Sequence, residues 1–91
     1  MTQISAQVSL YPIGTSDLAP AVEVFVATLR ASGFTCQVGP MSTLVYGDDV
    51  ALFEALQQAF REATRLGPAV LQLTVSNVCP LPPAQPGGDE R

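Results

Sequence analysis

The sequence contains no lysine, no histidine and no tryptophan, and only 13% of its 91 residues are charged. An average soluble domain carries about 25% charged residues. The four arginines and eight acidic residues give a formal net charge of −4, whereas phosphate binding requires clustered lysine and arginine. The composition therefore argues against a nucleic-acid-binding protein, and against docking on an anionic membrane surface.

The missing histidine and the scarce cysteine remove several kinds of catalytic and metal site. Nucleophilic systems of the Ser-His-Asp or Cys-His type cannot be assembled from a single chain without histidine. Cys36 and Cys79 are the only cysteines, too few for a structural zinc site or for the disulfide framework of a small secreted domain. We therefore expect no metal, no cofactor and no catalytic residue.

Long hydrophobic runs are also missing. The first residues carry no basic segment ahead of an apolar stretch, so we do not expect them to form a signal peptide. No apolar run approaches the roughly 20 residues of a membrane span. The sequence predicts a cytoplasmic domain without membrane insertion.

The first part of the chain predicts a strand followed by a helix. Residues 3–11 alternate between polar and apolar side chains, and a period of two is typical of a strand with one apolar face. Pro12 ends this strand because it lacks a backbone donor. Apolar residues then recur at helical spacing from about 17 to 32, and Gly33 stands where a helix commonly ends.

The second part predicts two short strands, a second helix and a last strand. Gly39-Pro40 separates the short strands, as in a hairpin. Asp48 or Asp49 caps the second helix, and Gly67-Pro68 ends it. The short strands span residues 34–38 and 41–46, and the last strand spans residues 69–78.

The order β-α-β-β-α-β predicts a ferredoxin-like α+β sandwich. Right-handed crossovers place both helices on one face of a four-stranded antiparallel sheet. We expect a single domain over residues 1–79. The remaining residues, 80–91, are rich in proline and glycine and are predicted to form a disordered tail.

The sheet face without helices is predicted to be polar and neutral. All twelve charged residues fall in predicted helices, turns or the tail. Hydroxyl and amide groups suit a surface that becomes partly buried yet keeps its hydrogen bonds. Packing against a second sheet, lining a small-molecule pocket, or simple exposure to solvent all fit. The residues expected there are Gln3, Ser5, Gln7, Ser9, Tyr11, Thr35, Gln37, Gln72, Thr74 and Ser76.

Three segments, together and in order, resemble a known family. They are Ser9-Leu10-Tyr11-Pro12, residues 41–48 (MSTLVYGD) and residues 75–80 (VSNVCP). They resemble the YkoF-like thiamine/hydroxymethylpyrimidine-binding family and, more broadly, thiamine-binding domains. The resemblance implies binding of thiamine or its hydroxymethylpyrimidine precursor without catalysis, linked to vitamin uptake or salvage. It also implies that a one-domain chain forms a homodimer, or a dimer of dimers, through the sheet face.

The chemistry of an aminopyrimidine suggests which residues bind it. Such a ring needs a few fixed hydrogen-bonding groups and a flat apolar wall. The hydrogen-bonding candidates are Gln7, Ser9, Ser42, Thr43 and Asn77, and the candidate walls are Tyr11, Tyr46 and Met41. Each also has a purely structural interpretation as an outward strand residue, a strand former or a turn residue.

Two other functions remain compatible with the sequence. One is a structural or regulatory module that uses the neutral sheet face for protein interaction and oligomerisation. The other is a small cofactor-free enzyme, which is least favoured because acid–base groups are scarce.

Overall fold

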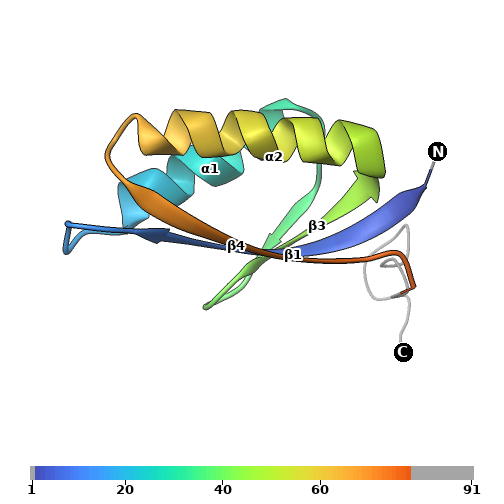
Figure 1. The fold of residues 1–91 in the computed structure, drawn as a ribbon, viewed down its shortest axis with the longest axis horizontal. Coiled ribbons are helices and arrows are strands. Elements are labelled where there is room, and N and C mark those ends of the chain that lie inside the picture. Colours follow the sequence, from blue (N-terminus) through green and yellow to red (C-terminus); the bar gives the residue numbers. More distant parts are fainter. Residues whose placement is uncertain (1, 79–91) are drawn as a thin grey trace.

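The structure is a computed structural model that describes residues 2–78. The predicted tail and Cys79 lie outside the described residues. Four strands and two helices follow one another in the predicted order, and the ferredoxin-like α+β fold is confirmed. The sheet is antiparallel throughout, with the strand order β2-β3-β1-β4 (Figure 1).

The central strand β1 (Gln3–Pro12) follows the predicted alternation. Ile4, Ala6 and Val8 are buried beneath the helices, because successive side chains of a strand point to opposite faces. The same strand pairs with β3 on one side and with β4 on the other. β1 therefore contributes both to the core and to the open face of the sheet.

Helix α1 (Ala19–Ala31) begins two residues later than predicted. The delay has a local cause, since the Asp17 backbone N–H donates to Thr15 Oγ1 at 3.1 Å in a turn. The Asp17 carboxylate still accepts a hydrogen bond from the Ala19 N–H at 3.3 Å. The end of the helix agrees with the prediction, because Gly33 has the left-handed φ of 95° that favours glycine.

Helix α2 (Asp49–Thr64) is capped by Asp48, whose Oδ2 accepts from the Ala51 N–H at 3.2 Å. This confirms the capping role expected for this aspartate pair. The helical spacing of apolar residues in this segment predicts Phe53 on the core face together with Leu52, and this is wrong, since Phe53 is 45% exposed. It lies about 100° around the helix from fully buried Leu52.

Strands β2 (Cys36–Val38) and β3 (Thr43–Asp48) start two residues later than predicted. The Gly39 N–H donates to the Ser42 carbonyl at 2.8 Å, and this tight turn takes Met41 and Ser42 out of the strand. β3 extends to Asp48, so one carboxylate stands at a strand end. The expectation that strands carry no charge is wrong at that position.

Gly47 is required by a close approach within the sheet. A Cβ atom added there would lie 2.5 Å from Cε1 of Phe34, and Phe34 packs against the core. Any larger residue at position 47 must displace the ring.

Strand β4 (Ala69–Ser76) ends two residues earlier than predicted and forms one edge of the sheet. The alternation of residues 69–78 predicts Leu71, Leu73 and Val75 on the core face. Leu71 and Leu73 do pack against the core, but Val75 is 38% exposed.

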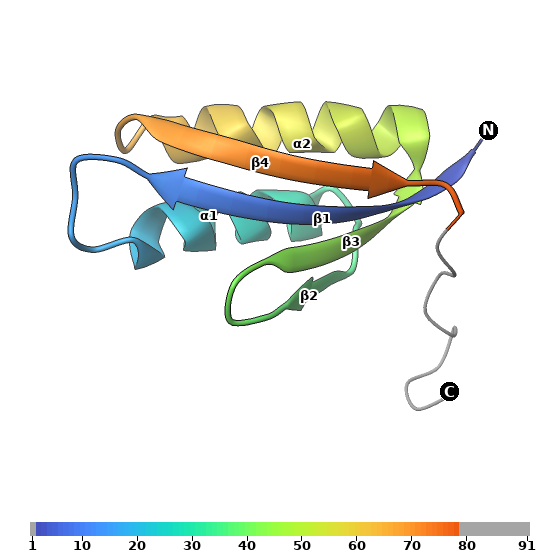
Figure 2. The same cartoon turned by 60° about the horizontal axis from the view of Figure 1, so that its bottom comes forward.

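Both helices cover one face of the sheet and leave the other open (Figures 1 and 2). The buried core lies between these layers, and its largest fully buried side chains are Val8, Leu29, Val45 and Leu52. No helix within residues 2–78 is long and apolar enough to cross a membrane.

Candidate functional site

The strand register defines which side chains lie on the open face. Residues paired across an antiparallel sheet point to the same side. Gln7 of β1 pairs with Leu44 of β3 and with Thr74 of β4, and Tyr11 pairs with Val70. The open face is therefore less uniformly polar than predicted, because Leu44 and Val70 belong to it.

A hollow of about 240 Å³ lies on this face. Its walls come from β1, from β4 and from the turn between β2 and β3, and none of its lining side chains is charged. The lining residues are Gln7, Ser9, Tyr11, Met41, Ser42, Gln72 and Thr74.

Two hydrogen bonds hold the β2–β3 turn against β1. Gln7 Nε2 donates to Ser42 Oγ at 3.2 Å, and Ser9 Oγ donates to the Met41 carbonyl at 3.1 Å. The first bond orients the Gln7 amide so that its Oε1 can accept from a ligand, and the Ser42 hydroxyl keeps its proton for donation. The hollow thus presents a neutral set of donors and acceptors beside the Tyr11 ring.

The structure brings four of the seven predicted site residues together, namely Gln7, Ser9, Tyr11 and Ser42. These four come from β1 and from the turn. They are distant in sequence and meet because the β2–β3 hairpin folds back along β1.

The other three predicted residues lie elsewhere. Tyr46 pairs with Ser5 on the open face, about 7 Å along β1 from Gln7, and Asn77 follows the end of β4. Thr43 is only 6% exposed and pairs with Val8 and Val38 on the covered side. It lines a neighbouring hollow of about 350 Å³, which Ser9 and Ser42 also border.

Met41, considered as a possible wall, also lines the hollow, whereas Gln72 and Thr74 were not among the predicted site residues. A signal for both of these was present in the sequence. In this topology the last strand pairs antiparallel with the first, and its polar positions then face the polar positions of β1. The register confirms this arrangement, with Gln72 opposite Ser9 and Thr74 opposite Gln7.

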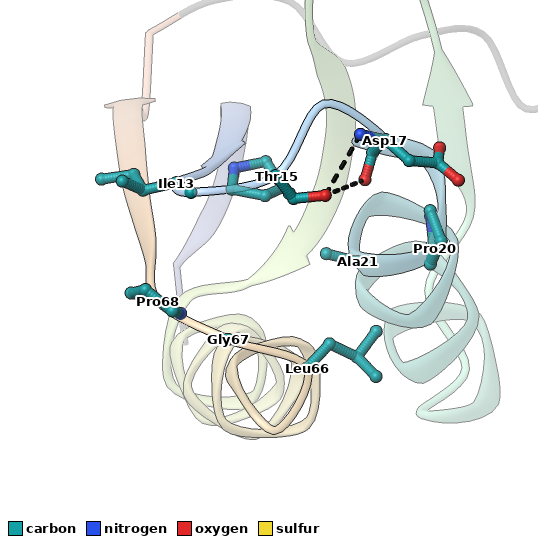
Figure 3. A pocket seen from close by; sticks show the side chains of 10 residues that line it. Ile13, Thr15, Asp17, Pro20, Ala21, Leu66, Gly67 and Pro68 are labelled. Carbon is teal, nitrogen blue, oxygen red and sulfur yellow. Dashed lines mark hydrogen bonds between the residues drawn. The ribbon is translucent and has the colours of Figure 1, made fainter.

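A larger hollow, of about 410 Å³, lies at one end of the molecule between the β1–α1 loop and the end of α2 (Figure 3). Its walls are mainly proline, glycine and aliphatic side chains. The Thr15 hydroxyl is engaged within the Thr15–Asp17 turn, and the Asp17 carboxylate is turned away from Ile13 and Pro68. Because it lacks converging free polar groups, this larger hollow is the weaker candidate.

The remaining chemistry-bearing groups offer little for catalysis. Burial raises the pKa of the Cys36 thiol, and Arg30 opposes this effect only in part, so the thiolate nucleophile is disfavoured. Among residues 2–78, no three His, Cys, Asp or Glu side chains are placed to hold a metal ion.

Comparison with known proteins gives the family. The model of the thiamine-binding protein family matches residues 6–76, which include every residue that lines the 240 Å³ hollow. The chain belongs to the thiamine-binding protein family. This confirms the resemblance found in the sequence. No curated protein matches the chain.

Solved structures share the fold at low sequence identity. A hypothetical protein from Methanocaldococcus jannascii is 19% identical with a TM-score of 0.77, covering 84% of this chain and 80% of the other. A protein from Streptococcus pneumoniae is 18% identical with a TM-score of 0.76, with coverages of 82% and 86%. A candidate thiamine biosynthesis/salvage protein from Thermotoga maritima is 20% identical with a TM-score of 0.72, with coverages of 80% and 81%.

Proposed function

We propose that the chain binds thiamine through its hydroxymethylpyrimidine ring, in the neutral hollow on the open sheet face, and that it performs no chemistry on the ligand. The observation that carries the proposal is the meeting of Gln7, Ser9, Tyr11 and Ser42 around one hollow in a chain of the thiamine-binding protein family. The proposed role is in uptake or salvage of the vitamin in the cytoplasm.

The hydrogen-bonding groups of the hollow complement an aminopyrimidine. Its exocyclic amine is a donor that Gln7 Oε1 can accept, and its ring nitrogens are acceptors for the Ser42 hydroxyl or the Gln72 amide. Tyr11, which is 44% exposed, offers a flat wall for stacking. A buried polar ligand gains affinity only when such groups are paired.

The size and charge of the hollow favour the pyrimidine over the whole vitamin. Pockets that enclose a drug-sized ligand measure about 300 Å³ or more, whereas this hollow measures about 240 Å³. No carboxylate lines it to neutralise a thiazolium. The pyrimidine therefore occupies the hollow, and the cationic ring lies outside it, near the Tyr11 face.

Oligomerisation through the open face is part of the same proposal. A second sheet packed on this face would close the hollow from above and exclude water from the ligand. The neutral side chains of the face would not leave an unpaired charge in such an interface.

Titration calorimetry with two variants tests the site. Gln7→Ala removes the amide that bonds Ser42, and we expect about a tenfold loss of affinity for thiamine and for hydroxymethylpyrimidine. Gln37→Ala is the matched control, because Gln37 is an exposed glutamine of β2 that pairs with Leu44 on the same face but does not line the hollow. Absence of binding in the unmodified protein, or equal losses in both variants, would contradict the proposal.

A further inference from the structure

The proposed ligands differ in charge at one position, the group attached to the methylene carbon of the pyrimidine ring. Thiamine carries a thiazolium cation there, hydroxymethylpyrimidine a neutral hydroxyl, and the phosphate ester of hydroxymethylpyrimidine a group with a charge of about −2. When the pyrimidine occupies the 240 Å³ hollow, this group lies outside the hollow, near the Tyr11 ring. The charged groups around Tyr11 therefore decide which form of the ligand binds.

The arginines of residues 2–78 lie away from this position. Arg30 of α1 donates a hydrogen bond to the Cys36 carbonyl at the β2 edge, at 3.4 Å. Arg61 lies in α2 and Arg65 directly follows it, in the helix layer that covers the opposite face of the sheet (Figure 1). The chain has no lysine. In the part of the chain that the structure describes, no cationic side chain is thus placed to bind a phosphate beside Tyr11.

The start of α1 is the other element near Tyr11 with an affinity for anions, because free N–H groups at a helix N-terminus attract them. It borders the same 350 Å³ hollow as Tyr11. Its first N–H groups are already used, since that of Ala19 donates to the Asp17 carboxylate at 3.3 Å and that of Val22 donates within the first turn at 3.3 Å. Pro20 has no N–H. A carboxylate of the chain therefore stands where a phosphate would bind.

We propose that the chain selects the unphosphorylated pyrimidine or vitamin and rejects the phosphate esters. This selectivity rests on the proposed function and specifies the class of its ligand. The face of the Tyr11 ring attracts a cation and repels an anion, and the net charge of −4 adds repulsion at longer range. A phosphate at this position loses hydration without gaining a positive partner, and such an unpaired charge is a means of excluding a competing ligand.

The position of the ester sets the order of affinities. In the phosphate ester of hydroxymethylpyrimidine, the phosphate is attached at the mouth of the hollow. In thiamine monophosphate it is carried on the hydroxyethyl chain of the thiazolium, farther from the hollow and near a cation of the ligand itself. We therefore expect thiamine and hydroxymethylpyrimidine to bind most tightly, thiamine monophosphate more weakly, and the pyrimidine phosphate most weakly.

Titration calorimetry of the complete chain measures this discrimination. Hydroxymethylpyrimidine and its phosphate ester are compared at the same pH and ionic strength. We expect the ester to bind about thirtyfold more weakly.

A cation introduced beside Tyr11 should reduce the discrimination. Val70 pairs with Tyr11 on the open face, is 49% exposed and does not line the hollow. We expect Val70→Arg to bind the phosphate ester about tenfold more tightly than the unmodified chain does, with the affinity for hydroxymethylpyrimidine unchanged. It should bind thiamine more weakly, because the guanidinium repels the thiazolium.

The matched control is Val50→Arg, which adds the same charge in the helix layer, where Val50 of α2 is 62% exposed. We expect it to leave all three affinities unchanged. Equal affinity of the unmodified chain for hydroxymethylpyrimidine and its ester would overturn the selectivity and leave the proposed function standing. An ester affinity that Val70→Arg does not raise, or that Val50→Arg raises equally, would also overturn it. If the unmodified chain bound none of these ligands, the proposed function itself would fail, and the selectivity with it.

Discussion

The two faces of the same sheet serve different purposes, and β1 shows the contrast residue by residue. Val8 is 2% exposed beneath the helices, while the adjacent Gln7 is exposed and lines the hollow on the open face. The covered face supplies the apolar burial that dominates folding. The open face retains polar groups that add little to folding and are suited to bind a ligand.

The largest loss of stability is expected when a polar side chain replaces an apolar one on the covered face. Val8→Gln buries an amide without a partner in a packed core, and we expect about 3 kcal/mol of destabilisation in urea unfolding. Gln7→Val should change stability by no more than about 0.5 kcal/mol. Similar losses in both variants would show that the faces do not differ as described.

The next largest loss of stability is expected from a larger residue at Gly47, on the covered side of the sheet. Gly47→Ala brings a methyl group into the Phe34 ring, and we expect a loss of about 2 kcal/mol in the free energy of unfolding. Replacing the ring as well, in Gly47→Ala/Phe34→Leu, should cost less than the two single changes combined, because the clash is then relieved. Simple additivity would contradict this explanation of the glycine.

Replacing Asp48 distinguishes a role of its carboxylate in helix capping from a role in ligand binding. Asp48→Ala removes the helix cap, and we expect a loss of about 1 kcal/mol with thiamine affinity unchanged. Glu54→Ala is the control, since Glu54 is an exposed acid in the middle of the same helix. A fall in thiamine affinity for Asp48→Ala alone would instead make Asp48 the partner of the thiazolium.

The smallest effect is expected from removing only the Tyr11 hydroxyl at the wall of the hollow. Tyr11→Phe keeps the flat ring, and we expect ligand affinity to stay within about a factor of two. Tyr11→Ala removes the ring and should lower affinity about tenfold. Calorimetry distinguishes these outcomes, and a large loss in Tyr11→Phe would mean that the hydroxyl, not the ring, carries the contact.

The fold could be predicted well because the alternation of polar and apolar residues in β1 and the helical spacing of apolar residues are both regular. The alternation of residues 3–11 and the helical stripes give the element order directly. The late start of β3 comes from the hydrogen bond that the Gly39 N–H donates to the Ser42 carbonyl. The late start of β2 lies at the end of α1, where the Phe34 N–H donates to the Leu29 carbonyl. Such a bond depends on backbone geometry that a residue pattern does not encode.

The site was predicted only in part because it depends on register. Gln7 and Ser9 were identified from chemistry and resemblance, but Gln72 and Thr74 join them through strand pairing. Thr43 was assigned to the site, although its position opposite Val8 points it to the covered side. A shift of one residue in a strand reverses the face of every side chain, so uncertain strand starts mislead site prediction more than fold prediction.

Titration of the ¹⁵N-labelled protein with thiamine, followed by NMR, tests the central claim most directly, because the side-chain amides of Gln7 and Gln72 report on the hollow itself. We predict that the largest chemical-shift changes occur at these two amides and at the backbone N–H groups of Ser9 and Ser42. Changes concentrated instead around Gly14 and Gly67, in the larger hollow at the end of the molecule, would contradict the assignment of the open sheet face as the binding surface.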